Sequence, residues 1–127
     1  MKRYNSKFRF AERKHCSEKS FDFALQVVSQ VKELQANNKE YVLSKQFLRS
    51  GTEIGALIRE AEHAESKKDF THKMSIALKE ANETKYWLDL LFRSDYIPKH
   101  QHEILSDESV QLIKLLASIV KSSKQKV

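Results

Sequence analysis

Residues 66–92, SKKDFTHKMSIALKEANETKYWLDLLF, decide the fold class. Apolar side chains recur in this stretch at spacings of three and four residues, which is the period of an amphipathic helix. The apolar stripe consists of Phe70, Met74, Ala77, Leu78, Ala81, Leu88, Leu91 and Phe92. Ser66 followed by Asp69 resembles a capping box, a common beginning of a helix. The stretch therefore predicts a long helix that buries one face.

Three further segments show the same periodicity, at about residues 20–36, at about residues 41–64 and from Pro98 onward. Each segment carries a single apolar stripe, and connections of a few residues separate them, which favours antiparallel neighbours. The chain has one proline and two glycines, and hence few of the turn signals that an all-β fold needs. The sequence predicts an all-α fold, an antiparallel up-down-up-down four-helix bundle.

The basic residues concentrate at the two ends of the chain. The net charge is +6, yet residues 1–20 hold seven Lys/Arg against two acids, and residues 114–127 hold four lysines and no acid. We expect a basic N-terminal arm at residues 1–19, a four-helix bundle at 20–122 and a basic C-terminal tail at 123–127. Such ends either attract nucleic acid or only keep a protein soluble, and both interpretations stay open here.

The sequence gives no sign of a membrane partner. No apolar run approaches the ~18 residues that span a bilayer. The first residues, MKRYNSKFRFAERKH, lack the apolar core of a signal peptide. Cys16 is the single cysteine, so no intrachain disulfide can form. We expect a cytoplasmic protein.

Residues 42–91, VLSKQFLRSGTEIGALIREAEHAESKKDFTHKMSIALKEANETKYWLDLL, resemble the signature of the bacterial four-helix-bundle protein family. This family is also called the 23S rRNA intervening-sequence protein. The motifs RSGTxIGA, SKKDF and IALKEAxETxYWL carry the resemblance, and KSFDFALQVV agrees more loosely. The resemblance implies a homo-oligomer, a pentameric barrel, and no catalytic residues. It also implies a fold similar to the accessory protein of diversity-generating retroelements, which binds nucleic acid and assists a reverse transcriptase.

Two candidate contact surfaces point to self-assembly. Gly51 and Gly55 lie one turn apart inside a predicted helix, and small residues at this spacing either admit another helix closely or mark a kink. That other helix could belong to the same bundle or to another subunit. The second surface is the back of residues 66–92, with Ile76, Tyr86, Trp87 and Leu90. Because two different surfaces on one chain can close a ring, we predict a ring-like homo-oligomer.

A row of residues without acids follows the outer face of the segment at 41–64. Its members are Lys45, Arg49, Thr52, Ala56, Arg59 and His63. Such a row can follow a phosphate backbone, so Lys45, Arg49, Arg59 and His63 are the predicted contacts with RNA or DNA, made without reading sequence. The other interpretation is an ordinary solvated face edged by acids.

Catalytic and metal chemistry have little support. Glu60-x-x-His63 matches a di-iron motif and Asp69-x-x-His72 nearly repeats it, but Glu60 and His63 are predicted to point away from the core. Cys16 lies in a predicted mobile arm, which provides no preorganised nucleophile. His100 and His102 are predicted to be solvated. We predict a non-enzymatic protein without metal or cofactor, and the alternative function is a protein–protein scaffold that does not bind nucleic acid.

Overall fold

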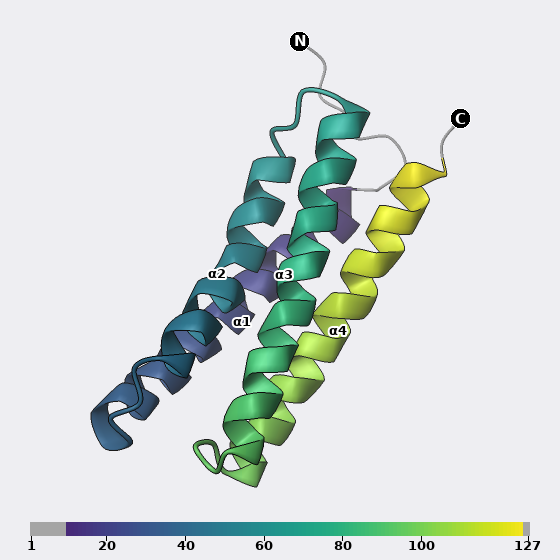
Figure 1. The fold of residues 1–127 in the computed structure, drawn as a ribbon. Coiled ribbons are helices and arrows are strands. Elements are labelled where there is room, and N and C mark those ends of the chain that lie inside the picture. The colour runs from purple at the N-terminus through teal and green to yellow at the C-terminus, as the bar shows by residue number, and fades with distance from the viewer. Residues whose placement is uncertain (1–9, 126–127) are drawn as a thin grey trace.

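The computed structural model describes residues 10–125, which form four helices joined by short loops (Figure 1). The helices are α1 (Phe10–Asn37), α2 (Leu43–Ala61), α3 (Lys67–Arg93) and α4 (Lys99–Lys124). Consecutive helices run in opposite directions, so the predicted antiparallel up-down-up-down bundle is confirmed. The helices pack in a square in which α2 contacts α1 and α3, and α4 contacts α3 and α1. Within the described residues, no helix is long and apolar enough to cross a membrane.

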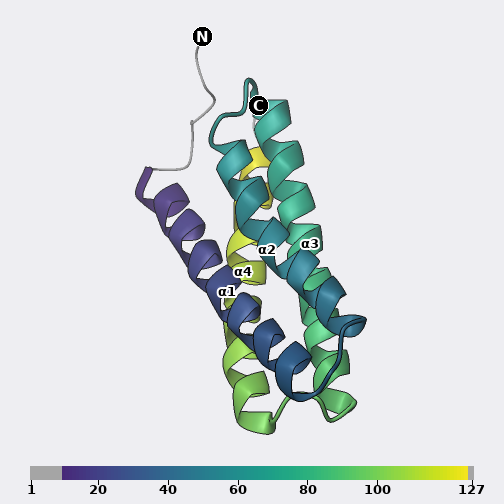
Figure 2. The same cartoon turned by 90° about the vertical axis from the view of Figure 1, so that its left-hand side faces the viewer.

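The first helix begins earlier than the sequence predicts. α1 starts at Phe10 instead of about Ser20 and slants across the other helices (Figure 2). Cys16 lies in this added part, Ser20 lies at the predicted beginning of the helix, and both are fully buried. The prediction of a mobile arm around Cys16 is therefore wrong. The sequence did not indicate a helix here because the buried positions Cys16 and Ser20 carry small side chains instead of large apolar ones. Residues 1–9 of the predicted arm and 126–127 of the predicted tail lie outside the described residues.

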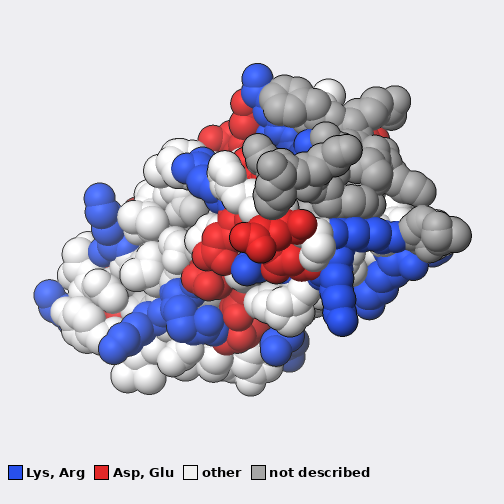
Figure 3. All heavy atoms as spheres, turned by 90° about the horizontal axis from the view of Figure 1, so that it is seen from above, with Lys and Arg blue, Asp and Glu red and all other residues white. Residues whose placement is uncertain are grey.

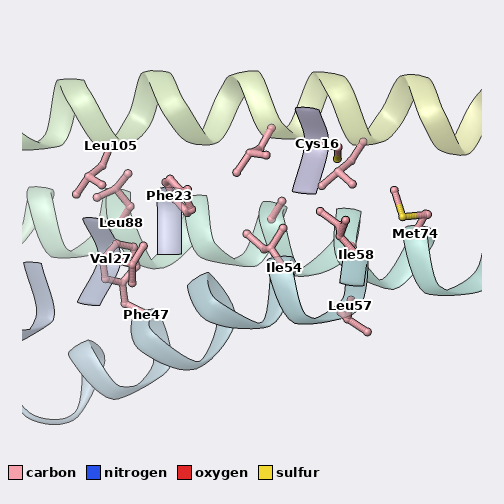
Figure 4. Close-up of a cluster of buried hydrophobic side chains, with 14 of the residues drawn as sticks. Cys16, Phe23, Val27, Phe47, Ile54, Leu57, Ile58, Met74, Leu88 and Leu105 are labelled. Carbon is pink, nitrogen blue, oxygen red and sulfur yellow. The ribbon is translucent and has the colours of Figure 1, made fainter. Parts of the chain in front are cut away.

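The core runs along the axis of the bundle and receives side chains from all four helices (Figure 4). Phe23 from α1, Phe47 from α2, Phe70 from α3 and Leu112 from α4 are among its largest fully buried side chains. Each fully buried apolar side chain of this size contributes roughly 1.5–3 kcal/mol of hydrophobic stabilisation. The core therefore fixes which face of each helix remains available for partners.

The ends of the helices show how local sequence sets their bounds. The Ser66 side chain accepts a hydrogen bond from the backbone N–H of Asp69 at 3.0 Å, as the predicted cap requires. The Glu40 carboxylate caps α2 by accepting from the backbone N–H groups of Val42, Leu43 and Ser44 at 3.2, 3.0 and 2.7 Å. Burial favours a higher pKa for Glu40, but the hydrogen bonds outweigh burial and lower that pKa.

The Glu40→Gln variant is expected to be less stable than the wild type by about 1–2 kcal/mol at neutral pH, because a neutral amide caps a helix less strongly than a carboxylate. The folded-state pKa of Glu40 is lowered, so its contribution is complete above the unfolded pKa and declines as the pH falls through the folded one. Urea unfolding at neutral pH and at about pH 3 should show the difference between the two proteins shrinking on acidification. A difference that stays constant with pH would contradict this role of the carboxylate.

Candidate functional site

The two glycines allow α1 to approach α2 within the same chain. A Cβ atom on Gly51 would lie 2.9 Å from Cγ1 of Val27, and one on Gly55 would lie 3.3 Å from Oγ of Ser20. Val27 and Ser20 both belong to α1, and α2 remains helical through both glycines. Of the alternatives that the sequence leaves open, the structure therefore supports packing inside the bundle. Gly51 is buried by α1 and cannot form part of an oligomer surface, which corrects that prediction for this residue.

An apolar groove of about 600 Å³ lies beside the glycines, on the outer surface between α1 and α2. We call it the α1/α2 groove. Its lining includes Phe21, Ala24, Leu25 and Val28 from α1, and Thr52, Gly55, Ala56 and Arg59 from α2. Phe21 and Leu25 are 51% and 55% exposed, which is unusual for two large apolar side chains one turn apart. The guanidinium carbon of Arg59 lies 5.9 Å from the centre of the Phe21 ring.

The predicted nucleic-acid row of Lys45, Arg49, Arg59 and His63 does not form one continuous cationic surface. Arg59 and His63 line the α1/α2 groove, and His63 follows the end of α2 in a turn. Arg49 makes ion pairs with Glu80, at 3.2 Å, and with Glu83. Lys45 is exposed at the other end of α2. The acids that neutralise Arg49 come from α3, and a periodicity argument on one helix cannot see them.

The predicted aromatic surface on α3 is partly exposed. Tyr86 is 59% exposed, and its ring meets Trp87 edge-to-face with a centroid distance of 5.0 Å. Trp87 is half-buried and donates a hydrogen bond from Nε1 to Glu83 at 2.9 Å. Ile76 and Leu90 are half-buried. The hydrogen bond from Trp87, together with the ion pair with Arg49, lowers the pKa of Glu83. Contact of this surface with another subunit stays a prediction.

A second groove, of about 880 Å³, lies between the beginning of α3 and the end of α4, and the sequence analysis missed it. We call it the α3/α4 groove. Lysines and hydroxyl groups line it, among them Lys67, Lys68, Ser75 and Lys124, together with His72. Figure 3 looks onto this end of the bundle, where Lys and Arg side chains gather on the α4 side and acids gather nearer the middle. In the sequence, this groove could have been indicated only by the absence of acids at the end of α4. That the lysines of α3 lie beside this end of α4 follows only from the fold.

His102 is half-buried, which corrects the prediction that it is solvated. Its Nε2 lies 2.9 Å from Oδ1 of Asp89, whose other carboxylate oxygen accepts a hydrogen bond from Lys85 at 2.7 Å. The His102 ring stacks on Phe92 with a centroid distance of 4.1 Å. Burial favours a higher pKa for Asp89, but Lys85 and His102 outweigh it and lower that pKa. The cluster ties α3 to the first turn of α4.

The residues considered for catalysis or metal binding do not converge. Glu60 and His63 are exposed, and Glu60 Oε1 lies 3.7 Å from Nζ of Lys73. Among residues 10–125, no group of three or more His, Cys, Asp or Glu side chains is placed to hold a metal ion. Burial raises the pKa of the Cys16 thiol to about 12, so the thiolate needed for a nucleophile is scarce at neutral pH.

Comparison with known proteins agrees with the motifs in α2 and α3. The family described as 23S rRNA-intervening sequence protein matches residues 12–118, most of the chain. The chain belongs to this family. This chain is similar to a solved member of the S23 ribosomal protein family, a protein with unknown function from Bacteroides thetaiotaomicron, with 52% identity and a TM-score of 0.85. The similarity covers 87% of this chain and 98% of that one. No match was found among curated proteins.

Proposed function

We propose that this protein acts without catalysis, as a homo-oligomeric bundle that binds RNA or DNA as an accessory factor. The observation that carries the proposal is the separation of two kinds of exposed surface. Large apolar side chains are exposed along α1 beside α2, whereas lysines without an ion pair among the described residues gather where α3 begins and α4 ends. The first surface suits a second copy of the chain, and the second suits a polyanion.

Self-assembly would cover the α1/α2 groove with a second copy. The occupant we propose is the exposed aromatic surface around Tyr86 and Trp87 on α3 of the next subunit. Because the groove and this aromatic surface lie on different helix pairs, the contact is heterologous and can close a ring, for which the family resemblance suggests a pentamer. Aromatic residues are also enriched in the cores of protein–protein interfaces, as expected if Tyr86 and Trp87 enter an apolar groove.

The Leu25→Glu variant tests the assembly surface. We expect light scattering to give a multiple of the chain mass for the wild type and a much smaller mass for Leu25→Glu, because a carboxylate in an apolar interface would be buried without a partner. Ile104→Glu is the matched control, since Ile104 is an exposed apolar residue on α4 outside the groove. A monomeric wild type, or equal masses for all three proteins, would contradict the proposed assembly.

Nucleic-acid binding is tested by titrating labelled RNA and DNA with protein of known oligomeric mass over a range of salt concentrations. Binding through phosphates predicts that the logarithm of the association constant falls linearly with the logarithm of the salt concentration. No binding of either nucleic acid at low salt would refute this part of the proposal.

The second candidate function is a protein–protein scaffold, and the apolar lining of the α1/α2 groove is the observation that favours it. The two functions differ in what remains bound after nuclease treatment. A protein partner that stays bound to the groove after digestion, and that is lost in Leu25→Glu, would support the scaffold.

A further inference from the structure

We propose that the α3/α4 groove is the surface that holds the phosphodiester backbone of a nucleic acid. This inference rests on the nucleic-acid binding proposed above and assigns it to a place other than α2. The groove runs between the first turns of α3 and the last turn of α4, and its hydroxyl and amino groups are chemically suited to phosphate oxygens.

The cations of the groove are free to bind a ligand. Lys67, Lys68 and Lys124 line the groove, and Lys121 lies one turn before Lys124 on α4. None of these four makes an ion pair with another of the described residues. His72 also lines the groove, where a ring N–H can donate a hydrogen bond to a phosphate oxygen. Lys68, Lys121 and Lys124 are exposed and Lys67 is half-buried, so their charges reach a ligand without a desolvation cost like that of fully buried groups.

Few acids oppose these lysines. From Ser109 to the end of the chain there is no Asp or Glu, and residues 66–79 contain only Asp69, which is itself part of the lining of the groove. Asp69 accepts a hydrogen bond from the backbone N–H of Glu65 at 3.3 Å and lies 3.8 Å from Nζ of Lys73, so its charge is partly neutralised. Glu65 is exposed in the loop before α3 and is the nearest other acid along the chain. The groove therefore keeps a net positive charge.

The groove also lies at the end of the bundle where the described part of the chain begins and ends. α1 begins and α4 ends at the same end of the bundle (Figure 1). The residues that precede Phe10 and follow Gln125 in the sequence include five Lys/Arg and no acid. The basic chain ends are thus attached at the end of the bundle that carries the groove, which raises the local attraction for a polyanion.

A hydrogen bond between α3 and α4 lies at the floor of the groove. The hydroxyl groups of Thr71 and Ser123 hydrogen-bond to each other across α3 and α4, and Ser123 is fully buried. Ser66, the cap of α3, and Ser75 also line the groove. The lysines therefore project from two helices whose separation is set by this bond and by the core beneath it.

The α2 row makes a weaker candidate for the same task. Arg49 already pairs with two carboxylates of α3, and Arg59 lies over Phe21 in an apolar groove. A phosphate at Arg49 would have to displace Glu80 and Glu83, which offsets part of what it gains. In the α3/α4 groove the carboxylate of Asp69 is part of the lining, but among the described residues no groove lysine would have to give up an ion pair.

The test compares two double variants with the same change in charge. Lys68→Glu with Lys124→Glu reverses two lysines on opposite sides of the α3/α4 groove. Lys32→Glu with Lys114→Glu reverses two exposed lysines on α1 and α4, outside the groove and outside the α2 row. All four positions are exposed, so both variants should fold, and circular dichroism and light scattering check their helicity and mass. The probes are a labelled single-stranded RNA and a labelled DNA duplex, each titrated over a range of salt concentrations.

We expect the groove variant to bind about tenfold or more weakly at low salt and to show a salt slope shallower by about two, one for each lost phosphate contact. The control should stay within about twofold of the wild type. If both variants lost the same amount of affinity, the loss would come from the change in net charge alone and the assignment would be overturned. A larger loss of affinity in the control would also overturn it. Wild-type protein that binds neither probe would instead refute the proposed function itself.

One further arm separates a nucleic acid from an acidic protein. Unlabelled RNA should displace the probe from wild-type protein at far lower concentration than polyglutamate of the same charge, because the ribose hydroxyl beside each phosphate adds a hydrogen-bond donor and acceptor for the hydroxyl groups of the groove, which the glutamate side chain lacks. Equal displacement by polyglutamate would overturn the assignment of the groove to a phosphodiester backbone.

Discussion

Gly51→Leu is expected to lower the free energy of unfolding by about 3 kcal/mol or more, because overpacking of a filled interface forces the helices apart. Even the first added atom would lie within 3.3 Å of three atoms of Val27. Val27 is β-branched and has one strongly preferred rotamer in a helix, so it cannot turn aside. Urea unfolding followed by circular dichroism measures the loss.

Two control variants separate steric conflict from other effects. Gly51→Ala combined with Val27→Ala should recover much of the stability that Gly51→Ala alone loses, because the smaller residue on α1 makes room for the new methyl group. Gly55→Ala should be tolerated better than Gly51→Ala, since its nearest neighbour is the Ser20 hydroxyl at 3.3 Å and alanine gains about 1 kcal/mol of helix propensity. Stable Gly51→Leu protein would show that α1 does not pack on α2 as described.

Phe23→Ala is expected to destabilise the bundle by about 3–5 kcal/mol, the usual range for removing a fully buried phenylalanine. Phe23 is 0% exposed and lies on α1 among side chains of the other helices (Figure 4). Its loss leaves a cavity, and α1 cannot collapse into the space because Val27 is already in contact with Gly51. Thermal and urea unfolding measure the change.

Phe21→Ala provides the matched control for this substitution. It is the same chemical change two residues earlier on the same helix, at a position that faces the α1/α2 groove. In dilute protein we expect a loss of no more than about 1 kcal/mol, mainly the contact with Arg59. If the two variants were equally destabilised, α1 would have to be rotated relative to its described orientation.

The helices were predictable where large apolar residues mark the stripe. α3 begins at Lys67, next to the predicted cap at Ser66, because its apolar period and its capping residues agree. The beginning of α1 was not predictable, since Cys16 and Ser20 occupy buried positions where a hydrophobic period gives little signal. The end of α2 at Ala61 was overestimated, because the residues after it remain compatible with a helix until tertiary contacts decide.

The candidate sites were less predictable than the fold, for a reason that Arg49 illustrates. Its position on the outer face of α2 follows from the helical period, but its partners Glu80 and Glu83 lie on α3. The two grooves could not be predicted for the same reason. Each is formed by two helices, and the sequence of one helix does not show which residues of the other lie beside it. Gly51 was recognised as a site of close approach, but the identity of the approaching helix required the structure.

The square arrangement of the helices also bears on how the chain reaches its native state. Three of the four helix pairs join neighbours along the sequence, and only the pairing of α1 with α4 must bring distant segments together. Local pairs form at little cost in loop-closure entropy, which is the condition under which helical proteins fold within microseconds to milliseconds. The α1–α4 contact therefore closes the longest loop of the four pairings, and a newly made chain can complete it only after α4 has been synthesised.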